Sequence, residues 1–209
     1  MTSLLHISAS PRGEASESLR IAGTFVDVYR DVNPDDEIET WDLWDGTLPE
    51  FGRAAAAAKM AVLGGAAPVG DDARAWHDVQ TTVERFLAAD RLLFSVPMWN
   101  AGIPYILKQF IDVVSQPGSI FGVDSQTGYQ HLLAGTGRKA AVIYASGVWG
   151  PDLGPEFGSN FQSTYFADWL RWTGIGDITV IRFHPTLSGD VDDARLTADA
   201  DARAAAKGF

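Results

Sequence analysis

The stretch Arg91-Leu-Leu-Phe-Ser-Val-Pro-Met-Trp-Asn100-Ala-Gly-Ile-Pro-Tyr105 decides the fold of this chain. It begins with a short apolar run, residues 92–96, that is typical of a parallel strand buried on both faces. Pro97 has no backbone N–H, so strand pairing is expected to stop there. A loop follows, and then apolar residues recur at helical spacing over 106–114. Ligands of open α/β sheets bind at the carboxyl ends of strands, so this loop is a candidate binding site.

Four more strand patterns surround this stretch, and helical patterns separate them. The strands are expected at residues 4–7, 37–43, 140–145 and 178–183, and the helices from near 16–18, at 53–63, from 71, at 158–173 and at 192–207. Strands that alternate with helices predict an α/β protein with a three-layer, doubly wound, five-stranded parallel sheet. Because the first strand stands at the N-terminus, the flavodoxin-like order 2-1-3-4-5 is expected.

One domain over residues 1–209 accounts for the whole chain, since no linker or repeat interrupts these patterns. Residues 119–123 and 129–133 flank a turn-rich segment and predict an additional hairpin. The acidic pairs at 71–72 and 192–193 are expected to be solvated helix caps.

Composition narrows the possible partners. The net charge is −11, which argues against nucleic acid as a partner. Cysteine is absent, so any redox chemistry needs a bound cofactor. No run approaches the ~18 apolar residues of a membrane span, and neither a basic region nor a long apolar segment stands before the first strand pattern. We therefore expect a cytoplasmic protein with no membrane partner.

The loop after the first strand places hydroxyl groups at a helix start. Ser10, Ser16 and Ser18 stand where the first turn of a helix also offers unpaired N–H groups and the positive end of its dipole. This combination suits a phosphomonoester. The alternative is that Ser16 only caps the helix, as serine often does. His6, in the strand before this loop, is expected to be a core or sheet-face histidine.

Two further loops follow strands, Pro97-Met98-Trp99-Asn100 and Ala145-Ser146-Gly147-Val148-Trp149. The first is expected to meet the serine loop at the switch point of the sheet. Adjacent Met and Trp fit a flat aromatic ligand, and a glycine after a strand lets backbone approach a ligand closely. The alternatives are that the Met and Trp side chains only cover the core and that Asn100 is a turn residue.

Taken together, these motifs resemble one known family. Ser-x-Ser-Pro-Arg-Gly at 8–13, Ser-x-Ser at 16–18, Pro-Met-Trp-Asn at 97–100 and Leu-Lys-x-Phe-x-Asp at 107–112 are similar to the FMN-dependent NADH-azoreductases, also called FMN-dependent NADH:quinone oxidoreductases. The resemblance implies bound FMN, NADH or NADPH as donor, a homodimer with FMN at the subunit interface, and ping-pong reduction of quinones and azo compounds.

The resemblance also assigns residues to the cofactor, by their numbers in this chain. It implies FMN contacts from Ser10, Ser16, Glu17, Ser18, Pro97, Met98, Trp99, Asn100, Ala101, Ala145, Ser146, Gly147 and Val148. The backbone N–H of Glu17, not its carboxylate, is expected to meet the phosphate. Val148 stands where relatives often have a second glycine. Trp99, Phe121 and Trp149 are expected to form an apolar slot for small aromatic substrates. The flavin carries the chemistry, and neither a catalytic side chain nor a metal is expected.

Two other classes of protein remain open. A flavodoxin-type electron carrier without NADH turnover fits the acidity of the chain, although the long 121–133 insertion and the aromatic loop fit an enzyme better. A non-redox phosphate-binding protein or phosphodiesterase would use the serine loop alone.

Overall fold

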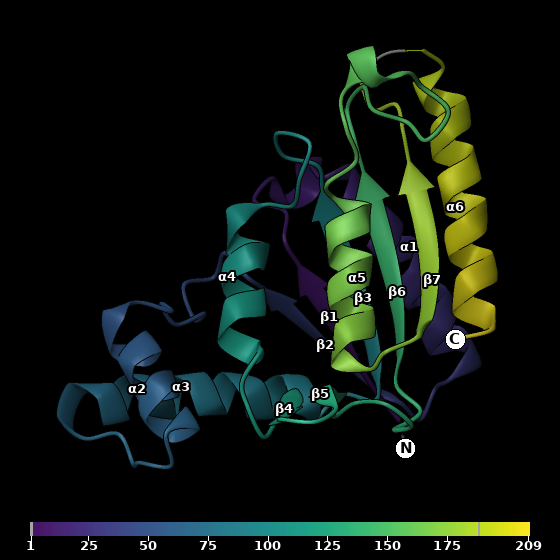
Figure 1. Ribbon diagram of the computed structural model, residues 1–209. Helices are drawn as coiled ribbons and strands as arrows, with labels where there is room; N and C mark the ends of the chain where they lie inside the picture. Colours follow the sequence, from purple (N-terminus) through teal and green to yellow (C-terminus); the bar gives the residue numbers. More distant parts are fainter. Residues whose placement is uncertain (1, 188) are drawn as a thin grey trace.

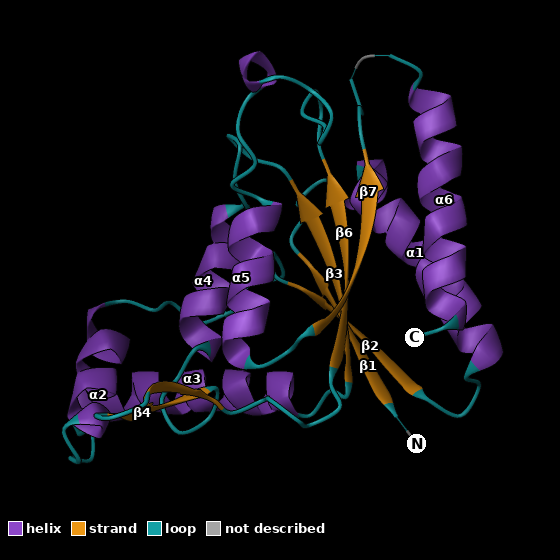
Figure 2. Cartoon of the chain, turned by 45° about the vertical axis from the view of Figure 1, so that its right-hand side comes forward, coloured by secondary structure: helices purple, strands orange, loops and turns teal. Residues whose placement is uncertain are grey.

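The five strand patterns form one parallel sheet with helices on both faces (Figures 1 and 2). The computed structural model describes residues 2–187 and 189–209. The strands are β1 (Ser3–Ser8), β2 (Glu37–Asp42), β3 (Arg91–Pro97), β6 (Lys139–Ala145) and β7 (Asp177–Phe183). Their order is β2-β1-β3-β6-β7. This confirms the expected order, because β4 (Phe121–Asp124) and β5 (Gly128–His131) form a separate antiparallel hairpin.

Helices cover the sheet in two groups. Figure 2 shows α1 and α6 on one face and α3, α4 and α5 on the other. Their bounds are α1 (Glu17–Val32), α3 (Gly70–Leu87), α4 (Tyr105–Val114), α5 (Ser163–Thr173) and α6 (Val191–Lys207). α2 (Arg53–Leu63) packs on α3 and projects from the sheet, and short 3-10 turns occupy Gly13–Ala15 and Pro155–Phe157.

The core lies in two layers because side chains alternate across each strand. Leu93 of β3 packs in the layer below α1 and α6, whereas Leu92 and Phe94 pack in the opposite layer. All three are fully buried, which explains why β3 reads as an apolar run and not as an alternation. Burying a leucine or phenylalanine side chain stabilises the fold by about 1.5–3 kcal/mol, so β3 and β6 at the centre anchor the sheet.

Two details of the expected helices are wrong. The helix expected over 158–173 begins at Ser163, because Gly158 has φ +102° and the Phe161 N–H bonds to the Ala101 carbonyl. The pair at 71–72 does not cap α3, whose first turn has no side-chain cap. These carboxylates lie inside that first turn and face the positive end of the helix dipole. The pair at 192–193 does not cap α6 either: it lies in the first turn, and the cap is Asp190, whose side chain accepts from Asp193 N at 3.0 Å.

Within the described ranges, the structure contains no helix that is both long and apolar enough to cross a membrane.

Candidate functional site

The carboxyl ends of β1, β3 and β6 meet at one edge of the sheet. The register pairs Ser8 with Ser95 and Pro97 with Ala145, so the loops that follow these strands start side by side. A cavity of about 190 Å³ lies between those loops. It is lined by Ser10, Arg12, Ser16, Glu17, Ser18, Pro97, Met98, Trp99, Ala145, Ser146, Gly147, Thr186 and Leu187. The structure therefore brings together the serine loop, the aromatic loop and the start of the third loop.

The start of α1 supplies the polar wall of this cavity. Ser16 is the N-cap of the helix, and its Oγ accepts from Leu19 N at 3.4 Å and lies 3.1 Å from Ser18 Oγ. The capping interpretation is thus correct, and the same hydroxyl still lines the cavity. Helix geometry leaves the N–H groups of Glu17 and Ser18 without intrahelical acceptors. Hydroxyl and N–H donors at the positive end of a helix dipole form a donor set for a phosphate.

Two arginines compensate the negative charge of the Glu17 carboxylate. Arg195 Nη2 lies 2.5 Å from Glu17 Oε1, and Arg20 Nε lies 2.9 Å from Oε2. The hydrogen bond from Arg195 is the main cause that lowers the pKa of Glu17. Because Arg195 belongs to α6, this carboxylate is held toward α6, and its charge is compensated beside the proposed phosphate position. That Glu17 meets a phosphate through its backbone N–H stays a prediction.

A buried polar chain fixes the start of α1 to the sheet. Ser95 Oγ donates to the carbonyl of Ser18 at 3.3 Å and lies 2.8 Å from His6 Nε2. With the Ser95 proton engaged in this way, His6 Nε2–H is the donor of the second bond. Burial lowers the pKa of His6 to about 4, so its ring is neutral at pH 7. His6 is a sheet-face histidine, as expected, and it supports the loop from below.

The aromatic loop is a strained two-residue turn. Trp99 and Gly102 exchange two backbone hydrogen bonds of 2.9 Å. Asn100 has φ +48° and Ala101 has φ +65°, as a type I′ turn requires at both central positions. Asparagine tolerates this region, whereas alanine is destabilised there by about 1–2 kcal/mol. The turn interpretation of Asn100 is correct, and the turn leaves the Trp99 side chain 36 % exposed at the cavity, not in the core.

A second cavity of about 310 Å³ adjoins the first and shares Met98 and Gly147 with it. Its lining is Met98, Asn100, Ala101, Gly147, Val148, Trp149, Phe157, Gly158 and Ser159. The third loop is held by Ser146 Oγ, which donates to the carbonyl of Trp149 at 2.5 Å. A Cβ on Gly147 would lie 2.8 Å from Leu187 Cδ1, so glycine allows the two loops to approach closely. Val148 and Trp149 thus face this second cavity and not the first.

One copy of the chain does not form the expected slot of Trp99, Phe121 and Trp149, so this prediction is wrong for a single chain. Phe121 packs against Trp172, with ring centroids 5.1 Å apart, and against Tyr129 at 5.6 Å. The ten residues of α4 carry the chain about 15 Å away from the binding edge before β4 begins. Figure 1 shows β4 at the opposite end of the sheet. Trp99 and Trp149 line adjoining cavities without Phe121.

Sequence reasoning missed Arg12, Thr186 and Leu187 in the lining of the first cavity. The sequence does contain an indication for Arg12, because a guanidinium within a hydroxyl-rich loop suits a phosphate. The other two follow β7, and Thr186 N donates to the carbonyl of Ser146 at 3.0 Å. The rule that ligands bind at the carboxyl ends of strands applies to β7 as well and would have indicated this loop.

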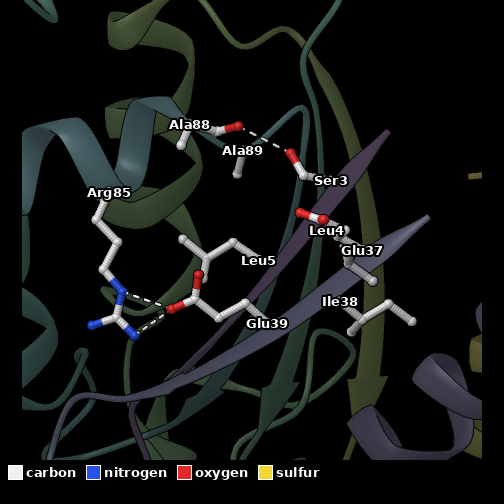
Figure 3. A pocket seen from close by; sticks show the side chains of 9 residues that line it. All are labelled: Ser3, Leu4, Leu5, Glu37, Ile38, Glu39, Arg85, Ala88 and Ala89. Atoms are coloured by element: carbon white, nitrogen blue, oxygen red, sulfur yellow. Dashed lines mark hydrogen bonds and ion pairs between the residues drawn. The ribbon is translucent and has the colours of Figure 1, made fainter. Parts of the chain in front are cut away.

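A larger cavity, of about 410 Å³, lies at the amino ends of β1 and β2 (Figure 3). Its walls include Glu39, Arg85, Ser3 and Ala88. Two pairs of the polar groups drawn there bond to each other: Arg85 Nε donates to Glu39 Oε1 at 2.8 Å, and Ser3 Oγ donates to the carbonyl of Ala88 at 2.9 Å. This cavity is separated from the serine and aromatic loops by the length of the sheet. The edge at the carboxyl ends of the strands therefore remains the candidate site. In the part of the chain that the structure describes, no three His, Cys, Asp or Glu side chains are grouped to hold a metal ion.

Sheet order and site position define a protein of the flavodoxin-like class, and the chain matches the family described as flavodoxin-like fold over residues 2–207. An FMN-dependent NADH:quinone oxidoreductase of Ruegeria pomeroyi is 44 % identical over 190 residues, which cover 91 % of this chain and 92 % of the relative. One from Desulfotalea psychrophila is 41 % identical over 201 residues, covering 96 % and 93 %. The chain belongs to the FMN-dependent NADH:quinone oxidoreductase family.

A solved structure supports the fold independently. The FMN-dependent NADH-azoreductase from Bacillus anthracis, in complex with FMN, superimposes with a TM-score of 0.90 at 22 % identity. The match covers 100 % of this chain and 99 % of the other. This likeness confirms the flavodoxin-like architecture.

The first prediction concerns pH. His6 remains neutral in the folded state down to about pH 4, whereas in the unfolded state it takes up a proton below about 6.5. The free energy of unfolding should therefore fall as pH decreases from 6.5 to 4, by about 3 kcal/mol from this group alone. Urea unfolding of wild type and His6→Gln at pH 7 and pH 4 measures the difference between their pH dependences. The exposed His77→Gln is the control, and equal losses in wild type and His6→Gln would contradict the account.

The second prediction concerns the turn. Ala101→Gly should raise the free energy of unfolding by about 1 kcal/mol, because glycine adopts positive φ without a steric penalty. Ala101→Val should lower it, because a β-branched side chain fits that region worst. The control is Ala57→Gly at an exposed position of α2, which should lower it by about 1 kcal/mol. Denaturant unfolding of the three variants checks this. If Ala101→Gly destabilised the protein as much as Ala57→Gly does, the assignment of strain would be refuted.

Proposed function

We propose that this protein is an FMN-dependent oxidoreductase that passes two electrons from NADH or NADPH to quinones and azo compounds by a ping-pong mechanism. The single observation that carries the proposal is the convergence of a serine-lined helix start and an aromatic turn on one cavity. The relatives from Ruegeria pomeroyi and Desulfotalea psychrophila, both named FMN-dependent NADH:quinone oxidoreductase, support the same activity.

The donor set fits FMN at both of its ends. Hydroxyls of Ser10, Ser16 and Ser18, the N–H groups at the start of α1 and the guanidinium of Arg12 would hold the phosphate. The turn 97–101 and the loop 145–148 would hold the ring by backbone and apolar contact. Bound FMN would supply the two-electron chemistry, and these groups supply orientation and electrostatics.

The second cavity supports a ping-pong order of events. Its volume of about 310 Å³ between Trp149 and the turn at Asn100 suits one flat ring at a time. Donor and acceptor would then occupy the same place in turn, and the aromatic wall of Trp149 would exclude water from it. The protein needs no nucleophile for this chemistry, in agreement with the absence of cysteine.

The third prediction tests the activity. The purified protein loaded with FMN should lose its visible flavin absorbance when NADH or NADPH is added without oxygen, and a quinone added next should restore it. Initial rates with both substrates varied should give parallel double-reciprocal lines. A flavin that stays oxidised with both nicotinamides would overturn the enzyme proposal and favour an electron carrier, to which the net charge of −11 is also suited.

We also propose a homodimer in which a second copy covers the second cavity. Phe161 and Phe157 are 65 % and 45 % exposed, and both are close to this cavity: Phe157 lines it, and Phe161 N donates to the carbonyl of Ala101 at 2.9 Å. Exposed aromatic side chains around a cavity are typical of a protein interface. We further propose one doubly wound domain over residues 1–209 that works in the cytoplasm; the five-stranded sheet, which takes strands from both halves of the chain, supports the domain assignment.

The fourth prediction tests the dimer. Phe161→Ser should shift the protein toward the monomer in sedimentation at micromolar concentration, because it removes apolar area from the proposed interface. Leu196→Ser is the matched control, since Leu196 is 70 % exposed on α6, across the sheet. Wild-type protein that sediments as a monomer would refute the homodimer.

A further inference from the structure

The segment before α5 contacts both walls of the proposed ring site. Gly158 and Ser159 line the second cavity, and Phe161 N donates to the carbonyl of Ala101, inside the strained turn. Residue 162 follows directly and is the N-cap of α5. A helix that began at 158 would commit these backbone groups to its own first turns, so the irregular backbone allows the contact with the turn.

Gln162 reaches the strands from which both loops start. Its side chain is fully buried, and its Nε2 lies 2.8 Å from the carbonyl of Val96 and 3.5 Å from that of Ala145. Val96 is the next-to-last residue of β3, before Pro97 and the aromatic loop, and Ala145 is the last residue of β6, before the third loop. The Ala145 carbonyl also accepts from Met98 N at 2.7 Å. One carboxamide therefore spans the last rung of the β3–β6 ladder.

Packing of α5 fixes this position. Phe166, one helical turn after Gln162, packs against Phe94 with ring centroids 4.9 Å apart. Side chains four residues apart lie on the same face of a helix, and side chains two residues apart lie on the same face of a strand. The aromatic pair therefore sets Gln162 above the end of β3, at Val96.

The amide is poorly explained by stability alone. Gln162 Oε1 is buried and has no hydrogen-bond partner among the described residues, which is unfavourable. An apolar side chain of the same length would fill this space without an unpaired oxygen. The distinctive contribution of the residue is thus its pair of donor contacts to the two strands.

We propose that Gln162 is a positioning residue for the flavin ring: it couples the turn 99–102 to the loop 146–149 so that the two walls keep a fixed spacing. It lines neither cavity, so it acts through the backbone that it holds. The inference rests on the proposed function, because it concerns the geometry of the FMN site.

The chain offers a matched control in Gln116. Its side chain is also fully buried, its Nε2 donates to the carbonyls of Asp112 and Val113 at 2.8 Å each, and its Oε1 also has no partner among the described residues. It lies after the last turn of α4, at the end of that helix away from the binding edge. Gln162→Met and Gln116→Met thus each remove one buried carboxamide, the first beside the binding edge and the second away from it.

The experiment compares FMN binding by the two variants with that of the wild type. Gln162→Met should weaken FMN affinity about tenfold, alter the visible circular dichroism of the bound flavin and shift its reduction potential. Gln116→Met should lower the melting temperature to a similar extent but leave affinity, spectrum and potential unchanged. Wild-type affinity and spectrum in Gln162→Met would overturn the inference while leaving the proposed function intact. Wild-type protein that binds no FMN would overturn both.

Gln162→Glu provides a second, isosteric test that does not depend on the methionine variant folding. Burial raises the pKa of such a carboxyl group, so the variant is titrated from pH 5.5 to pH 9.5. Where the carboxyl group is ionised it offers no donor to the two carbonyls and the flavin spectrum should be perturbed, and where it is protonated its O–H restores one donor and the spectrum should return toward that of the wild type at the same pH. A variant spectrum that matches wild type throughout this titration would contradict the proposal.

Discussion

The hydrogen bond from Met98 N–H to the Ala145 carbonyl, 2.7 Å long, closes the ladder between β3 and β6, and the site depends on it. Pro97 lacks an N–H, so this is the last rung before the strands separate. Both strands end in register, at Pro97 and Ala145, and β1 ends beside them. The loops after β1 and β6 therefore each begin one strand spacing, about 4.8 Å, from the strand end that precedes the aromatic loop, although the sequence separates the three loops by tens of residues. A ligand that needs a phosphate site and an aromatic wall finds both at this edge.

Several groups at this edge are unfavourable when considered locally and are compensated by distant parts of the chain. Ala101 at positive φ is held by the Phe161 N–H, from the segment before α5. The charge of the Glu17 carboxylate, beside the proposed phosphate position, is compensated by Arg195 of α6. The buried His6 ring stays neutral and bonds to Ser95. Each of these residues has an unfavourable local conformation or environment that a contact from a distant part of the chain compensates. Such residues are expected to cluster at a functional site.

The buried strands and their order could be predicted because an apolar run and its turn signals are local properties of the sequence. The serine loop, the aromatic loop and the third loop could also be found, since each directly follows such a strand. The start of α5 could not, because the backbone before Ser163 bonds to Ala101 and not to its own next turn. Phe121 was misplaced for a related reason: its neighbours Tyr129 and Trp172 come from a hairpin and from the end of α5, and no local pattern reports that contact.

The central claim is that one ligand is held by its phosphate at α1 and by its ring at the aromatic turn. Titration of the apoprotein with FMN and with riboflavin, which lacks the phosphate, tests this directly. Several charge-assisted hydrogen bonds at the helix start should make FMN bind at least about 100-fold more tightly than riboflavin. Equal affinities for the two flavins would contradict the account, because they would place the phosphate outside the serine-lined helix start.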